Sequence, residues 1–111
     1  MHPNLKFSYL YRDAGNYKNY NEVVFGNRQG LSVEEVRAAI EANLIEGQWF
    51  IAKDMELPSL FFKEFDWDEE LDHNWHEFQN LEETDEEASK REDIQVFLER
   101  LADKKYGSLF D

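Results

Sequence analysis

The middle of the chain, residues 64–87, reads EFDWDEELDHNWHEFQNLEETDEE. Twelve of these residues are Asp or Glu, and none is Lys or Arg. Large aromatic side chains and two of the three histidines lie among the acids, namely Phe65, Trp67, His73, Trp75, His76 and Phe78. Both the architecture and the function of the protein depend on how this acidic segment is arranged.

Two arrangements of the acidic segment are open from the sequence. The apolar residues in its middle recur at helical spacing, which would give a helix over residues 69–82. Such a helix would place glutamates at the negative end of its own dipole, and its clustered acids would have no neighbouring cation. A strand over residues 75–81, entered through an acidic turn at residues 66–74, avoids both problems. We therefore predict the strand.

The segments around it predict an α+β domain, in which a small antiparallel or mixed sheet of about five strands carries two helices. Alternating or compact apolar runs predict the strands, at residues 5–12, 22–25, 49–52, 60–65 and 75–81. Residues 13–19 are typical of a turn, so we expect the first two strands to form a hairpin with a long loop.

Each helix is predicted from a capping box that is followed by an apolar stripe. Ser32-Val33-Glu34-Glu35 precedes the first helix, which we expect to end near Gly47 because glycine readily adopts a left-handed conformation. Ser89-Lys90-Arg91-Glu92 precedes the second helix, although Thr84 offers an earlier start. The chain has 111 residues, so we expect a single domain over residues 1–111.

Composition excludes several kinds of site and location. The chain has no cysteine, so it has no disulfide and no thiolate metal site. No basic stretch followed by an apolar run marks a secretory signal, and no apolar run is long enough to span a membrane. No glycine-rich phosphate loop or nucleophile motif is present. We therefore expect a cytoplasmic protein without a cofactor and without a catalytic residue.

The net charge of −13 arises from one half of the sequence. Residues 1–53 carry six basic and six acidic side chains, whereas residues 54–111 carry six basic and nineteen acidic ones. This asymmetry predicts a face with a strong negative potential, which would repel nucleic acid and anionic membranes. The expected partner is therefore a positively charged protein surface, such as that of a nucleic-acid-binding enzyme.

Two groups of residues are candidates for contacting such a partner. Acids that would steer it and tryptophans that would anchor it lie in the acidic segment: Asp66, Trp67, Asp68, Glu69, Glu70, Asp72 and Trp75. A loop rich in tyrosines and cations adds Tyr11, Arg12 and Tyr17. In size and charge the chain resembles small acidic inhibitors of nucleic-acid enzymes, such as immunity proteins and phage proteins that mimic DNA. The resemblance implies a non-catalytic protein that blocks a basic site.

Two other functions remain open. On a helix, His73, His76 and Glu77 would share one face and could bind a metal ion in a small enzyme. On a strand, His76 would point away from the other two, and the spacing departs from the zinc-protease motif. The simpler interpretation is a partly exposed polar pair beside Trp75. The third function is a structural module, in which exposed aromatic residues pair two copies as a homodimer.

Overall fold

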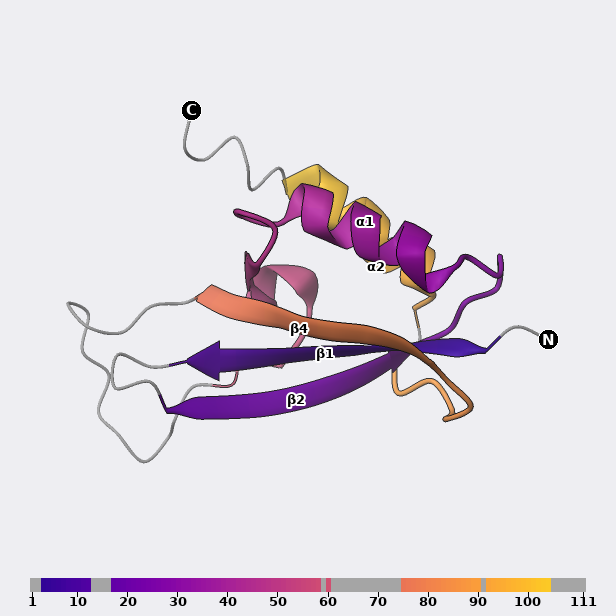
Figure 1. Ribbon diagram of the computed structural model, residues 1–111, viewed down its shortest axis with the longest axis horizontal. Coiled ribbons are helices and arrows are strands. Elements are labelled where there is room, and N and C mark those ends of the chain that lie inside the picture. The colour runs from indigo at the N-terminus through magenta and orange to yellow at the C-terminus, as the bar shows by residue number, and fades with distance from the viewer. Residues whose placement is uncertain (1–2, 13–16, 59, 61–74, 91, 105–111) are drawn as a thin grey trace.

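Figure 1 shows the computed structural model, which describes residues 3–12, 17–58, 60, 75–90 and 92–104. Within those ranges the chain forms four strands and two α-helices: β1 (Asn4–Arg12), β2 (Lys18–Phe25), α1 (Val33–Asn43), β3 (Trp49–Ile51), β4 (Trp75–Thr84) and α2 (Ile94–Lys104). A short 3-10 helix, η1 (Ala52–Met55), follows β3. The strands pair in the order β2-β1-β4-β3, and every pair is antiparallel. Both helices lie on the same side of the sheet, next to β4 (Figure 1).

The predicted α+β class is confirmed. The strand expected at residues 75–81 is confirmed as β4, which continues to Thr84, so the alternative helix is wrong where the chain is described. The described residues form four strands rather than about five, and the strand predicted at 60–65 lies outside them except for Leu60. β2 begins four residues earlier than predicted, because residues 18–21 pair with β1 despite their turn-forming asparagines.

One side of β1 forms the centre of the core. Leu5, Phe7, Tyr9 and Tyr11 alternate along this strand and are at most 2% exposed, so they share the face that the helices cover. The centroid of the Phe7 ring lies 5.1 Å from that of Phe97 in α2. The helices contribute five fully buried side chains: Val36, Ile40, Ile94, Phe97 and Leu101. Helix-to-sheet packing thus buries one face of the sheet and leaves the other away from the helices.

The first helix begins as its sequence predicts. The hydroxyl of Ser32 accepts the N–H of Glu35 at 3.1 Å, which satisfies one of the amides that a helix start leaves unpaired. α1 ends at Asn43, shortly before Gly47. Gly47 has a φ of 72°, in the left-handed region that glycine adopts at little energetic cost, and the chain continues from there into β3.

The second helix begins later than its sequence predicts. α2 starts at Ile94 rather than near Ser89, and the carboxylate of Asp93 accepts the N–H of Gln95 at 3.3 Å. The Ser89 hydroxyl instead accepts the N–H of Val24 at 2.8 Å. The predicted capping box at Ser89 is therefore wrong, because this serine bonds the outer edge of β2.

Candidate functional site

The sheet has an outer face on the side opposite to the helices. Its side chains alternate with the core side chains along each strand, because successive residues of a strand point to opposite faces. Cross-strand pairing defines the members of this outer face: Asn4, Lys6, Ser8, Leu10, Arg12, Lys18, Tyr20, Glu22, Val24, Trp49, Ile51, Trp75, Glu77, Asn80, Glu82 and Thr84.

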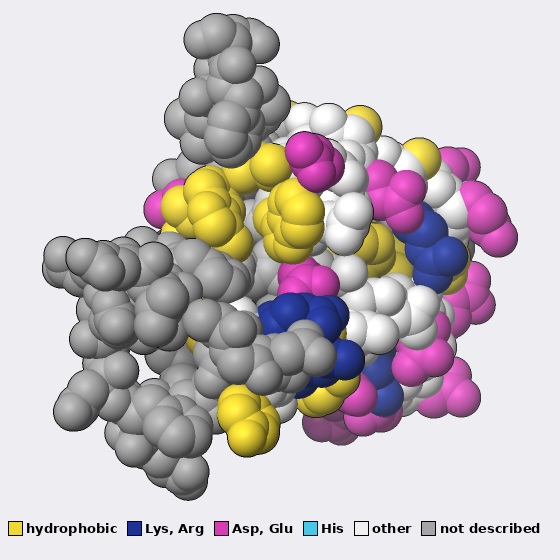
Figure 2. All heavy atoms as spheres, turned by 60° about the vertical axis from the view of Figure 1, so that its left-hand side comes forward, with side chains coloured by type: hydrophobic (Ala, Val, Ile, Leu, Met, Phe, Trp, Pro, Cys, Tyr) yellow, Lys and Arg dark blue, Asp and Glu magenta, His cyan; other side chains and the backbone are white. Residues whose placement is uncertain are grey.

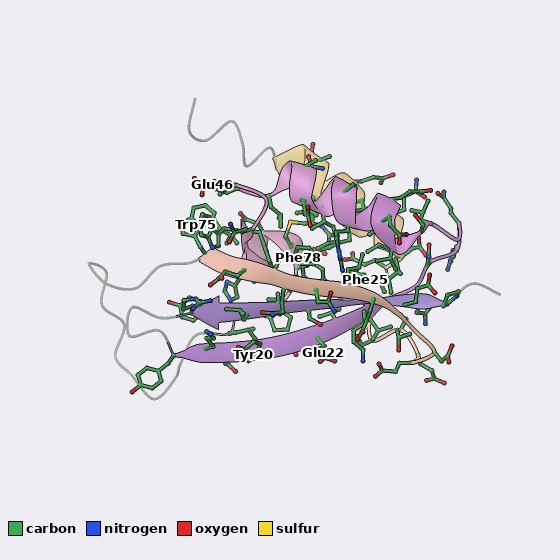
Figure 3. The ribbon with its side chains drawn as sticks, viewed as in Figure 1. Tyr20, Glu22, Phe25, Glu46, Trp75 and Phe78 are labelled. Atoms are coloured by element: carbon green, nitrogen blue, oxygen red, sulfur yellow. The ribbon has the colours of Figure 1, made fainter. Side chains whose placement is uncertain are left out.

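Apolar side chains occupy one end of the outer face, where β4 begins. Ile51 lies directly opposite Trp75, and Trp49 lies opposite Glu77 in the neighbouring pair. Trp49, Ile51 and Trp75 are partly buried, and we refer to them as the aromatic end. Figure 2, which brings this side of the molecule forward, shows hydrophobic side chains gathered beside Lys and Arg side chains. Trp75 stands at the start of β4 (Figure 3).

An ion pair lies beside the aromatic end of the outer face, between the last residue of β1 and the third residue of β4. Nε of Arg12 donates to Oε2 of Glu77 at 2.8 Å, and Nη2 of Arg12 donates to Oε1 at 3.3 Å. The hydrogen bond to Glu77, together with the charge of that carboxylate, raises the pKa of Arg12 above its ordinary value. The pair holds the end of β1 beside the start of β4 and offsets the charge of Glu77.

Carboxylates dominate the sheet at the other end of β4 and just beyond it. We refer to residues 82–87 as the acidic turn, because they carry five exposed carboxylates: Glu82, Glu83, Asp85, Glu86 and Glu87. Lys6 forms ion pairs with Glu86 and with Glu22, the latter at 3.4 Å. Hydrogen bonds from Lys6 and then from Thr84 lower the pKa of Glu86. Lys6 offsets only part of this charge, so the acidic turn is negative at neutral pH.

The two ends of the outer face are separated by the length of β4. Nine residue steps from Trp75 to Thr84, at about 3.3 Å each, give roughly 30 Å. Trp75 lies at the opposite end of the strand from the acidic turn. The acids that were predicted to surround Trp75, at residues 66–72, lie outside the described residues, so that prediction stays a prediction.

The predicted contact residues fall into three groups. Arg12 and Trp75 lie on the outer face, and Tyr17, just before β2, is 64% exposed. Tyr11 is 2% exposed and lies on the core face, where its ring centroid is 5.2 Å from that of His76, so it presents almost no surface to a partner. The remaining contact residues lie outside the described part of the chain: Asp66, Trp67, Asp68, Glu69, Glu70 and Asp72.

The described residues on either side of 61–74 are held together. The N–H of Leu60 donates to Nε2 of His76 at 3.0 Å. The side-chain amide of Asn19 donates to the Leu60 carbonyl at 3.1 Å, which ties the same residue to β2. Both attachment points of this acidic stretch are therefore at the end of the sheet that carries Trp75.

The candidate metal ligands are not brought together where they are described. His76 is fully buried and its Nε2 accepts the Leu60 amide, whereas Glu77 points to the outer face and pairs with Arg12. His73 lies outside the described residues, within which no three His, Asp or Glu side chains form a cluster that could hold a metal ion. The position of His76 suits a structural role.

Sequence reasoning missed Trp49 and Ile51, which the structure places beside Trp75. A signal for them was available in the run Trp49-Phe50-Ile51. If Phe50 is buried in a strand, its two neighbours must face the other way. Phe50 is indeed fully buried.

Comparison with protein-family models, with curated proteins and with solved structures found no match for this chain. None of the helices in the described ranges has the length and apolar character needed to cross a membrane. What the protein does must be inferred from the outer face itself.

Proposed function

We propose that this protein is a non-catalytic binding protein that docks on a positively charged surface of a partner protein and blocks it. The main support is the acidic turn, whose five exposed carboxylates lie at and just beyond the end of β4. The aromatic end supplies a second, apolar contact on the outer face. A fitting partner would present a basic patch beside an apolar one, as at the nucleic-acid-binding site of an enzyme.

The acidic turn would act mainly on the rate of association. Its carboxylates lie within six consecutive residues, so their fields add over the Debye length of about 8 Å at physiological salt. A concentrated field of one sign raises the rate of encounter with an oppositely charged protein by roughly ten- to a thousandfold. That contribution falls steeply as salt is added.

The aromatic end would act mainly on the lifetime of the complex. Tryptophan is among the residues that dominate binding energies, because it buries a large apolar area with little loss of side-chain freedom. Burial of apolar area is insensitive to salt at moderate concentration, unlike attraction between charges. The two ends of the outer face can therefore be distinguished by kinetics.

The test compares two triple variants that carry the same net charge. A partner is first captured from lysate with the wild-type protein, and its binding kinetics are then measured at low and at physiological salt. The first variant neutralises the acidic turn: Glu83→Gln, Asp85→Asn and Glu87→Gln. The matched control neutralises exposed glutamates in and just after α1: Glu34→Gln, Glu41→Gln and Glu46→Gln. Either change removes three charges from −13 and leaves −10.

We expect the acidic-turn variant to associate about tenfold more slowly than the control at low salt, with the difference shrinking at higher salt. Trp75→Ala should speed dissociation and leave the salt dependence unchanged. Equal slowing in both triple variants would show that only total charge matters. That result, or an association rate insensitive to salt, would refute docking through the acidic turn.

A further inference from the structure

β2 forms one border of the sheet (Figure 1). In an antiparallel sheet, successive residues of a border strand direct their backbone N–H and C=O groups alternately inward and outward. Val24 is an outward residue, because its N–H donates to Oγ of Ser89 at 2.8 Å and its C=O accepts the N–H of Ser89 at 2.9 Å. Lys18, Tyr20 and Glu22 have the same parity, so their backbone groups also point outward.

Among the described residues after β4, Ser89 and Lys90 cover this border at Val24, where both of their N–H groups donate to the Val24 carbonyl. Asp93 pairs with Gly26, just beyond the end of β2. In the part of the chain that the structure describes, no other segment bonds the outward backbone groups of residues 18–22. We refer to residues 18–22 as the open edge. Open strand edges are sites at which a further strand can add to a sheet.

The sequence of the open edge, Lys18-Asn19-Tyr20-Asn21-Glu22, complements itself in the antiparallel direction. When two copies are aligned about Tyr20, Lys18 of each copy lies opposite Glu22 of the other, and the two Tyr20 side chains face each other. Opposite charges and aromatic pairs in directly opposed positions stabilise paired strands. Independently of the docking function, we propose that two copies of this protein associate through β2 and join their sheets.

The register about Tyr20 is the one that uses the whole open edge. It provides about six backbone hydrogen bonds, two at each of its three directly opposed pairs. A shift by two residues one way would require Val24, whose backbone groups are already bonded. A shift the other way would align Lys18 with Tyr20 and take Glu22 beyond the open edge. A shift by four residues would place two lysines or two glutamates opposite each other.

The open edge is accessible to a second copy. Tyr20 is 58% exposed, and Figure 3 places it on β2, the strand that lies farthest from the helices in that view. Antiparallel pairing of identical strands has a two-fold axis perpendicular to the sheet. The helices of both copies would then lie on the same side of the joined sheet, over β4 and not over the border.

Antiparallel pairing also limits the repulsion between two copies that each carry a charge of −13. Val24 marks the position of the acidic turn along β2, because it bonds Ser89, two residues after that turn. Val24 lies four residues from Tyr20. In the pair, the two Val24 residues would be about 27 Å apart along the strands. This separation is about three Debye lengths at physiological salt, so screening should remove most of the repulsion. We therefore expect the dissociation constant to fall as salt is raised from about 20 to about 150 mM.

The test is sedimentation velocity of the full chain and of three variants, at concentrations up to about 200 µM and about 150 mM salt. Lys18→Glu and Glu22→Lys each place like charges opposite each other at two positions, and we expect each to weaken the dimer about tenfold. The double variant that carries both substitutions restores opposite charges and should return the dissociation constant to within about threefold of wild type.

Circular dichroism serves as the control that each variant is folded. Lys18→Glu is the safer single variant, since Glu22 has an additional ion pair with Lys6. A wild-type protein that stays monomeric throughout this range would overturn the proposal. So would single variants that dimerise as well as wild type, or a double variant that stays as weak as the single ones.

Discussion

Replacing His76 with leucine should weaken the contact that holds the two described ends of residues 61–74 together. Nε2 of His76 accepts the Leu60 N–H at 3.0 Å, and the imidazole is fully buried. Three aromatic rings surround it at centroid distances of 5.2–6.1 Å. Leucine has a similar volume but no acceptor, so the Leu60 N–H would lose its partner in a buried setting.

The expected loss follows from the energy of an unsatisfied buried amide. Removing one partner of a buried hydrogen bond costs about 1–3 kcal/mol, and the greater hydrophobicity of leucine offsets part of this. We therefore expect His76→Leu to lower the free energy of unfolding by about 1–2 kcal/mol, or Tm by roughly 5–10 °C. His76→Gln is the matched control, because its amide oxygen can reach the position of Nε2 and accept the same N–H.

The assay combines urea denaturation with amide hydrogen exchange. In His76→Leu the Leu60 amide should exchange much faster than in wild type, while amides in the centre of β1 stay protected. His76→Gln should keep the protection of Leu60 and most of the stability. If the leucine variant protects Leu60 as wild type does, the hydrogen bond does not hold this contact. If glutamine is as damaging as leucine, the imidazole acts through packing rather than as an acceptor.

Three further changes test the packing around the sheet. Glu92 accepts two hydrogen bonds from Arg100 at 2.8 Å each, which lower the pKa of Glu92. A carboxylate with a lowered pKa stabilises the fold above its ordinary pKa and loses this contribution as the pH falls. Glu92→Gln should therefore cost about 1 kcal/mol in urea melts at neutral pH. The difference from wild type should shrink as the pH falls below the ordinary pKa of glutamate and through the lowered pKa of Glu92, and a difference that stays constant in acid would contradict this. Phe97→Ala removes a fully buried ring and should cost about 3–5 kcal/mol in the same melts, whereas Val96→Ala, at a side chain 42% exposed, should cost less than about 0.5 kcal/mol. Gly47→Ala forces a side chain into a φ of 72° and should cost about 1 kcal/mol, so an unchanged midpoint would show that the turn relaxes.

β4 could be predicted as a strand because the alternative helix would be destabilised by residues within the same segment. A helix over residues 69–82 would have ended on Glu82 beside its own negative dipole, and the energy of that contact depends only on nearby residues. β1 was predictable for a related reason, since its alternation of apolar and polar residues has the period of a strand. The early start of β2 was not predictable, because Asn19 and Asn21 favour turns until they pair with β1.

The start of α2 shows where a local motif fails. The spacing from Ser89 to Glu92 fits a capping box, and so does the chemistry of both residues. The Ser89 hydroxyl bonds the Val24 N–H instead, a contact between residues 65 positions apart. The Ser89 hydroxyl could accept the nearby N–H of a helix start or the distant N–H of Val24. Local sequence indicates only the first, because the second comes within reach through the tertiary arrangement.

The candidate site was predicted only in part. Tyr11 has the same strand parity as Phe7 and Tyr9, so its burial followed from the alternation that predicted the strand. The pairing of Arg12 with Glu77 did not follow from the sequence. It depends on the register between β1 and β4, which shifts at an irregularity between Ser8 and Tyr9. A shift of one residue there moves every later side chain to the other face.

Docking of a basic partner and pairing of two copies would use neighbouring but separable parts of the sheet. Lys18, Tyr20 and Glu22 belong both to the outer face and to the open edge, whereas the acidic turn lies outside the open edge and makes no contact in the proposed pairing. In the joined sheet the two outer faces would run in opposite directions, so each acidic turn would lie at the end where the other copy has its aromatic end. Lys18→Glu should therefore weaken pairing about tenfold. It replaces a positive charge of the outer face with a negative one, so it should not slow association with a basic partner. A slower rate in this variant would mean that the partner spans both copies and that docking requires the dimer.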